Sequence, residues 1–184
     1  MISYERNKIR LRPIRRSDIT QSLIWRNIPE IRENALGYRF PVTEKMEEEW
    51  YESALDDQGM KRVIFAIETI EDEEFVGFIN LNSIDWIARR CSFGITIGER
   101  KYQGKGIGAD SMRVLFNYAF ECLNLRKICL EVASFNEAAL HLYRKFGFVE
   151  EGTLQEHLYL ENTYHDIILM RMFDHEFRSK YGAA

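Results

Sequence analysis

The sequence has few of the residues that hold small secreted or metal-binding proteins together. Its three cysteines, Cys91, Cys122 and Cys129, form no C-x-x-C pair. An odd number of widely spaced cysteines argues against a disulfide framework and a thiolate metal site, so we expect reduced core thiols in a cytoplasmic protein. The four histidines are scattered, and we expect no bound metal.

Long apolar runs are also missing. No segment approaches the roughly 20 residues of a membrane-spanning helix, and no apolar stretch of the signal-peptide kind follows the charged N-terminus. The net charge of −4 gives no support for nucleic acid as a partner. Because there is no linker, repeat or low-complexity tract, we expect a single domain, residues 1–184.

Hydrophobic periodicity predicts strands and helices in a mixed order. Strands are expected over residues 9–12, 63–67, 75–79, 91–97 and 128–132, and two more over 148–173 with a turn at Glu161 and Asn162. Helices are expected over residues 17–27, from Pro29, and over 44–55, 112–123 and 136–147. This order favours an α/β (α+β mixed) fold in which helices flank a central sheet.

Some side chains are expected in particular environments. Met46, Trp50 and Leu55 form the predicted apolar face of the helix over 44–55, and the glutamates at positions 47, 48, 49 and 52 are expected on its solvated face. The tryptophans are expected in the core or in pocket walls. They are Trp25, Trp50 and Trp86.

The most informative segment lies between the strand over 91–97 and the next helix. Its sequence is Gln103-Gly104-Lys105-Gly106-Ile107-Gly108. Glycines let the backbone approach a ligand closely, and the first turn of a helix leaves N–H groups without partners. We therefore expect this loop to bind phosphate or pyrophosphate, and Lys105 adds a positive charge.

Three kinds of phosphate-binding loop have sequences related to this one. The nucleoside-triphosphate loop does not fit, because Ala109 and Asp110 stand where that motif has glycine and lysine. The dinucleotide fingerprint fits by its letters, but residues 98–103 separate it from the preceding strand, and a dinucleotide-binding oxidoreductase is kept as a rival. The loop also matches the coenzyme A pyrophosphate loop of acetyltransferases, Q/R-x-x-G-x-G/A.

With its flanks, the loop resembles the GNAT superfamily of N-acetyltransferases. The resemblance covers the whole chain in element order and is carried by residues 93–108, 124–132 and 136–148. Residues 11–13 and the tail are similar to the RimJ/RimL type, which includes acetyltransferases of ribosomal proteins. Residues 102–148 are similar to spermidine acetyltransferases, and residues 25–32 resemble acetyltransferases of amino-sugar nucleotides.

The resemblance implies a GNAT-like fold, with a mixed, mostly antiparallel sheet in which the parallel strands over 91–97 and 128–132 splay apart. Acetyl-CoA is implied as cosubstrate in that gap, near the main chain of Ile95 and Ile97. Its pyrophosphate would rest on Gln103, Gly104, Lys105, Gly106, Ile107 and Gly108. Asn136 and Tyr143 share a helix face. Asn136 is implied as a cofactor contact, and Tyr143 as the general acid that protonates the leaving thiolate.

The expected reaction is direct attack of a primary amine on the thioester in a ternary complex. The base is left open between Glu99, Glu33 and water. A non-catalytic acyl-CoA-binding sensor is the alternative of another class.

The acceptor is expected on the side of the amino-terminal helices, near residues such as Trp25 and Tyr38. A peptide N-terminus or an amino-sugar-like molecule is ranked ahead of spermidine, because Arg26, Arg32 and Arg39 suit an anionic group. No nucleic acid or membrane partner is expected, and a homo-oligomer is left open.

Overall fold

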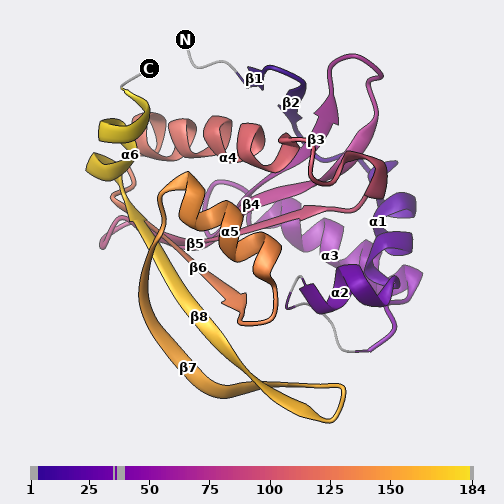
Figure 1. Cartoon of the computed structure of the whole chain (residues 1–184). Coiled ribbons are helices and arrows are strands. Elements are labelled where there is room, and N and C mark those ends of the chain that lie inside the picture. Colours follow the sequence, from indigo (N-terminus) through magenta and orange to yellow (C-terminus); the bar gives the residue numbers. More distant parts are fainter. Residues whose placement is uncertain (1–3, 35, 37–39, 183–184) are drawn as a thin grey trace.

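The structure is a computed structural model that describes residues 4–34, 36 and 40–182. An eight-stranded sheet with the order β1-β2-β3-β4-β5-β6-β8-β7 forms its centre (Figure 1). The strands are β1 (Glu5–Arg6), β2 (Ile9–Arg12), β3 (Val63–Thr69), β4 (Phe75–Asp85), β5 (Arg90–Ile97), β6 (Lys127–Ala133), β7 (Val149–Leu160) and β8 (Thr163–Phe173). Among the neighbouring strands of this sheet, β5 and β6 are parallel and the other pairs are antiparallel, which confirms the expected mixed, mostly antiparallel sheet.

The helices cover both faces of the sheet. They are α1 (Asp18–Arg26), α2 (Pro29–Asn34), α3 (Glu44–Asp56), α4 (Ile107–Asn117), α5 (Glu137–Phe146) and α6 (Asp174–Tyr181), with a short 3₁₀ helix η1 (Arg100–Tyr102) and a π-helical turn η2 (Tyr118–Cys122) after α4. In Figure 1, α1, α2 and α3 gather on one side of the sheet's centre, whereas α4 and α5 lie on the other side. The elements expected from periodicity are present, and α6 and the short β1 are additions to them.

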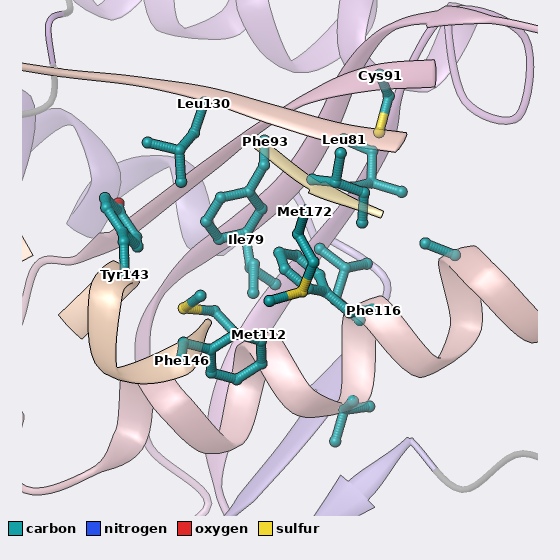
Figure 2. Packing of buried hydrophobic residues seen from close by; sticks show 14 of the residues in the cluster. Ile79, Leu81, Cys91, Phe93, Met112, Phe116, Leu130, Tyr143, Phe146 and Met172 are labelled. Atoms are coloured by element: carbon teal, nitrogen blue, oxygen red, sulfur yellow. The ribbon is translucent and has the colours of Figure 1, made fainter. Parts of the chain in front are cut away.

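Two hydrophobic cores, one on each face of the sheet, explain which strand residues are buried. The larger lies between the sheet and α4, α5 and α6, and includes Phe93, Phe116, Phe146 and Met172 (Figure 2). The smaller lies between the sheet and the amino-terminal helices. It includes Ile64, Ala66, Phe78 and Ala54 of α3. Because helices cover both faces, β3 is buried along its whole length instead of alternating.

Four side chains lie in environments other than the expected ones: Leu55, Glu47, Trp86 and Cys122. Leu55 is exposed, and the buried positions of α3 are Glu47 and Ala54. Trp86 is exposed and donates its indole N–H to the carbonyl of Met60, so it belongs neither to the core nor to a pocket wall. Among the cysteines, Cys91 is buried, Cys129 is half-buried and Cys122 is exposed.

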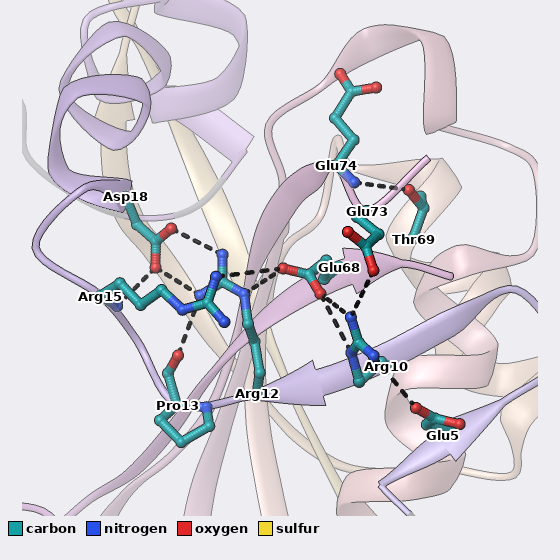
Figure 3. A network of polar contacts seen from close by, with 10 residues as sticks. All are labelled: Glu5, Arg10, Arg12, Pro13, Arg15, Asp18, Glu68, Thr69, Glu73 and Glu74. Atoms are coloured by element: carbon teal, nitrogen blue, oxygen red, sulfur yellow. Dashed lines mark hydrogen bonds and ion pairs between the residues drawn. The ribbon is translucent and has the colours of Figure 1, made fainter. Parts of the chain in front are cut away.

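A buried ionic network joins the first long strand to its neighbours (Figure 3). The Arg12 guanidinium donates to Glu68 of β3 at 2.5 Å and to both carboxylate oxygens of Asp18 at the start of α1, at 2.8 and 2.9 Å. Arg10 donates to the other oxygen of Glu68 at 2.5 Å. Arg12 of β2 thereby joins Glu68 of β3 to Asp18 at the start of α1, so the network fixes α1 relative to the sheet.

Replacing Glu68 by glutamine is expected to lower the free energy of unfolding by about 2 kcal/mol at pH 7, because it removes charged hydrogen bonds from two arginines. Burial alone raises the pKa of Glu68, but the hydrogen bonds from Arg10 and Arg12 lower it overall. A lowered folded-state pKa contributes stability above the unfolded value of about 4.3, and this is lost as the pH falls. Urea unfolding at pH 7 and below pH 4 should therefore show the difference shrinking in acid. An equal difference at both pH values contradicts this role.

Candidate active site

The parallel strands β5 and β6 separate towards their carboxyl ends. Their pairing covers only Arg90, Cys91 and Ser92, the last opposite Cys129. The N–H of Gly98 donates to the carbonyl of Val76 at 2.9 Å. In the β4–β5 ladder, every second residue of β5, counted back from Gly98, therefore directs its main-chain N–H and carbonyl toward β4. In an antiparallel ladder, residues between the bonded pairs turn their main-chain groups to the other side. The main-chain groups of residues 95 and 97 therefore face the gap between β5 and β6.

One of these groups already has a partner. The side-chain amide of Gln103 donates to the carbonyl of Ile97 at 2.8 Å, so that carbonyl is not unpaired. The same bond ties the glycine loop to the end of β5. The remaining main-chain groups of Ile95 and Ile97 on this side lie beyond the end of the β5–β6 ladder. An extended amide chain placed in the gap can pair with them as a strand does.

The glycine loop ends at the amino end of α4. Gly104 and Gly106 have φ values of +70° and +86°, and a Cβ built at either meets nothing within 4 Å. The first helical bond from the loop runs from the N–H of Asp110 to the carbonyl of Gly106 at 3.0 Å. The N–H groups of residues 107–109 therefore precede the helical hydrogen-bond pattern. Open space beside these N–H groups fits a pyrophosphate.

A cavity of about 680 Å³ connects the gap with this loop. Eight of the residues expected at the site line it. They are Ile95, Ile97, Gln103, Gly104, Gly106, Gly108, Asn136 and Tyr143. Two others are not part of the lining. The Ile107 side chain is buried in the core, and the Lys105 ammonium lies 5.7 Å from the centre of the ring of Tyr102, which does line the cavity.

The helix α5 places two polar side chains on the wall of this cavity. Asn136 is the N-cap of α5, and its side-chain oxygen accepts from the N–H of Ala139 at 3.1 Å. Tyr143 lies two turns further on, at the margin of the aromatic cluster and near Phe93 (Figure 2). Its ring centre is 6.2 Å from that of Phe93 and 5.8 Å from that of Phe148. Burial raises the pKa of Tyr143 to about 12. Its hydroxyl therefore stays protonated at neutral pH.

A second cavity of about 270 Å³ lies on the opposite face of β5, beneath the amino-terminal helices. It shares Ile31 and Thr96 with the larger cavity, so the two meet at the edge of the gap. Its lining comes from α1, α2, α3 and from strands β3, β4 and β5. The lining residues are Ser22, Trp25, Arg26, Ile31, Arg32, Trp50, Arg62, Ile64, Phe78, Asn80, Asn82 and Thr96.

Neither carboxylate suggested as a base lines a cavity. Among the described residues, Glu30 is the one acidic residue in either lining, and it forms an ion pair with Arg100 at 3.2 Å. Glu33 and Glu99 are absent from both linings. Tyr38 and Arg39, expected near the acceptor, lie outside the described residues.

Sequence reasoning did not assign five polar residues of the smaller cavity to a site: Ser22, Arg62, Asn80, Asn82 and Thr96. Asn80 and Asn82 alternate with the buried Ile79 and Leu81 on β4, and the Asn82 amide donates to Asn80 at 2.6 Å. Two asparagines at alternate positions of a central strand are a signal of a polar cavity that the sequence already carried. Arg62 had no such signal, because it lies in the turn before β3 and reaches the cavity only through the fold.

The described part of the structure has neither a metal-ligand cluster nor a membrane-spanning helix. No group of three or more His, Cys, Asp or Glu side chains is arranged to hold a metal ion among residues 4–34, 36 and 40–182. In the same residues, none of the helices has the length and apolar character needed to cross a membrane.

Comparison with known proteins gives consistent matches over most of the chain. The family model of the acetyltransferase (GNAT) domain matches residues 8–149. The spermidine N(1)-acetyltransferase of Escherichia coli K12 is 32% identical over 180 residues, which cover 95% of this chain and 91% of that protein. A Bacillus subtilis protein provisionally named a ribosomal N-acetyltransferase is 30% identical over 109 residues, 59% of each chain.

Solved structures give the same picture. The spermidine N-acetyltransferase from Vibrio cholerae in complex with CoA and spermine has a TM-score of 0.85 and 29% identity, covering 92% of this chain and 98% of that chain. A dodecameric structure of that enzyme has a TM-score of 0.79 and 28% identity, covering 95% and 98%. These relatives do not specifically support the RimJ/RimL type that the sequence led us to expect.

Proposed function

The chain belongs to the GNAT family of acetyl-CoA-dependent N-acetyltransferases, and we propose that it acetylates the primary amine of a small molecule by direct attack in a ternary complex. The observation that carries this proposal is the junction of two cavities at the splayed strands. The larger suits an extended cosubstrate, and the smaller opens beside Thr96 from the opposite face. A thioester at the junction is reached by an amine without a covalent enzyme intermediate.

Four elements of the larger cavity have proposed roles in binding or in the reaction. The main chain of Ile95 and Ile97 pairs with the pantetheine amides, and the N–H groups that follow Gly106 hold the pyrophosphate. Tyr143 faces the leaving thiol. A tyrosine of ordinary pKa, about 10, nearly matches a thiol of about 8.5, but burial raises the pKa of Tyr143 to about 12. Tyr143 therefore acts mainly by donating a hydrogen bond to the developing thiolate.

The acceptor class is part of the proposal. The names of the relatives support a polyamine ahead of the peptide or amino sugar expected from the sequence, and spermidine is the first acceptor to assay. The arginines of the smaller cavity point the other way, because they oppose a polycation and favour an amine that also carries an anionic group, so both classes of acceptor have to be assayed. The dodecameric relative supports a homo-oligomer, which light scattering in solution tests. We also propose a cytoplasmic location, since the reaction needs acetyl-CoA.

Acetyl-CoA and CoA are expected to raise the melting temperature, whereas NADH and ATP are not. A ligand at about 100 times its Kd stabilises the folded state by about 2.7 kcal/mol, which is a shift of roughly 5–10 °C for a domain of this size. Differential scanning fluorimetry measures the shift. Equal stabilisation by NADH would revive a dinucleotide-binding oxidoreductase.

A further inference from the structure

We infer that the smaller cavity binds an anionic group of the acceptor, so that the substrate is a primary amine that also carries a phosphate or a carboxylate. This inference rests on the proposed function and names the acceptor class for the same site. It separates the chain from polyamine acetyltransferases, whose acceptors are polycations.

The charge of the cavity wall is the first observation. Arg26 of α1, Arg32 of α2 and Arg62 before β3 all line the cavity. No carboxylate belongs to the described lining, and neither Arg32 nor Arg62 forms an ion pair within the described part of the chain. Like charges at close range repel, so this wall opposes a polyamine and attracts an anion.

The second observation is a buried support behind Arg26. Glu47 of α3 is fully buried, and its Oε2 lies 3.2 Å from Arg26 Nε. Its other oxygen accepts from the Ser22 hydroxyl at 2.5 Å. The Arg26 guanidinium also lies 4.4 Å from the centre of the Trp50 ring. Glu47 and Trp50 therefore fix the orientation of Arg26 in the cavity wall, and a planar guanidinium held in place is suited to carboxylate and phosphate.

The charge balance follows from these contacts. Glu47 offsets Arg26, while Arg32 and Arg62 leave an excess of positive charge in the wall. The reacting amine has to reach Thr96, where the cavity meets the gap between β5 and β6. The anionic group is therefore a second feature of the same small molecule, because the cavity measures only about 270 Å³.

Matched pairs of amines test the inference by thiol release from acetyl-CoA. The phosphate arm compares ethanolamine with O-phosphoethanolamine and glucosamine with glucosamine 6-phosphate. The carboxylate arm compares β-alaninamide with β-alanine, and spermidine is assayed alongside. We expect the anionic member of at least one pair to have a kcat/KM at least tenfold above its neutral partner and above spermidine. The arm with the larger increase in kcat/KM identifies the anionic group as phosphate or carboxylate.

Two variants link the preference to the cavity. Arg32→Gln and Arg62→Gln are each expected to raise the KM for the anionic acceptor about tenfold, with the KM for acetyl-CoA unchanged. The matched control is Arg90→Gln, since Arg90 is exposed and lines neither cavity. Because Arg32 and Arg62 have no ion-pair partner among the described residues, their loss should not alter the melting temperature.

The results distinguish failure of the anionic-acceptor inference from failure of the proposed acetyltransferase function. If spermidine or the neutral amines are the best acceptors, or if both arginine variants behave like the control, the inference is overturned and the proposed function stands. If no amine in the panel releases thiol, the proposed function fails and the inference fails with it.

Discussion

Replacing Tyr143 by phenylalanine is expected to lower kcat by about 10²-fold and to leave the affinity for CoA unchanged. The ring keeps its contacts with Phe93 and Phe148, whereas the hydroxyl on the cavity wall is lost. That hydroxyl is the donor proposed for the leaving thiolate, and it acts as charge develops in the transition state. Steady-state kinetics with saturating acetyl-CoA, together with calorimetric binding of CoA, separates the two effects.

The control for this variant is Tyr118→Phe. Tyr118 also has a pKa raised by burial, but it lines neither cavity. It should retain the kcat of the unmodified protein. Full activity in Tyr143→Phe would mean that water or another group stabilises the thiolate.

The second large effect is expected at Gly106. Valine at this position is predicted to raise the Kd for CoA by roughly 10²-fold. The φ of +86° costs a side-chain-bearing residue about 1–2 kcal/mol, and a branched side chain occupies space that the pyrophosphate needs. Isothermal titration calorimetry with CoA measures the change.

A matched control exists elsewhere in the chain. Gly59 has a φ of +79° and nothing within 4 Å of a built Cβ, but it lines neither cavity. Gly59→Val carries the same backbone strain, so it should lower stability without changing the Kd. A Kd for Gly106→Val equal to that of Gly59→Val contradicts a pyrophosphate site at the loop.

The site residues that the sequence predicted best lie in short continuous segments, whose conformation depends mainly on neighbouring residues in the chain. The loop from Gln103 to Gly108 lies between a strand and a helix, so its glycines and the helix start are fixed by neighbours in sequence. The i, i+4, i+7 spacing from Asn136 to Tyr143 likewise places both on one face of α5. Both segments line the larger cavity.

The parts that sequence did not predict depend on tertiary contacts. Glu47 stands in a run of glutamates typical of a solvated face, but α3 packs against α1 and buries it beside Ser22 and Arg26. The helix α6 has only one fully buried apolar residue, Phe177, among charged ones, so its periodicity is weak. Its burial against α4 and β8 is a property of the fold.

Acetyl transfer itself is the decisive measurement for the proposed function. Purified protein is mixed with acetyl-CoA and a panel of primary amines, and thiol release and acetylated product are measured together over a matrix of both concentrations. We expect equal amounts of thiol and N-acetylated amine, with double-reciprocal plots that intersect as a ternary complex requires. Binding of acetyl-CoA without acetylation of any amine would contradict the proposed function and would identify a non-catalytic acyl-CoA-binding protein.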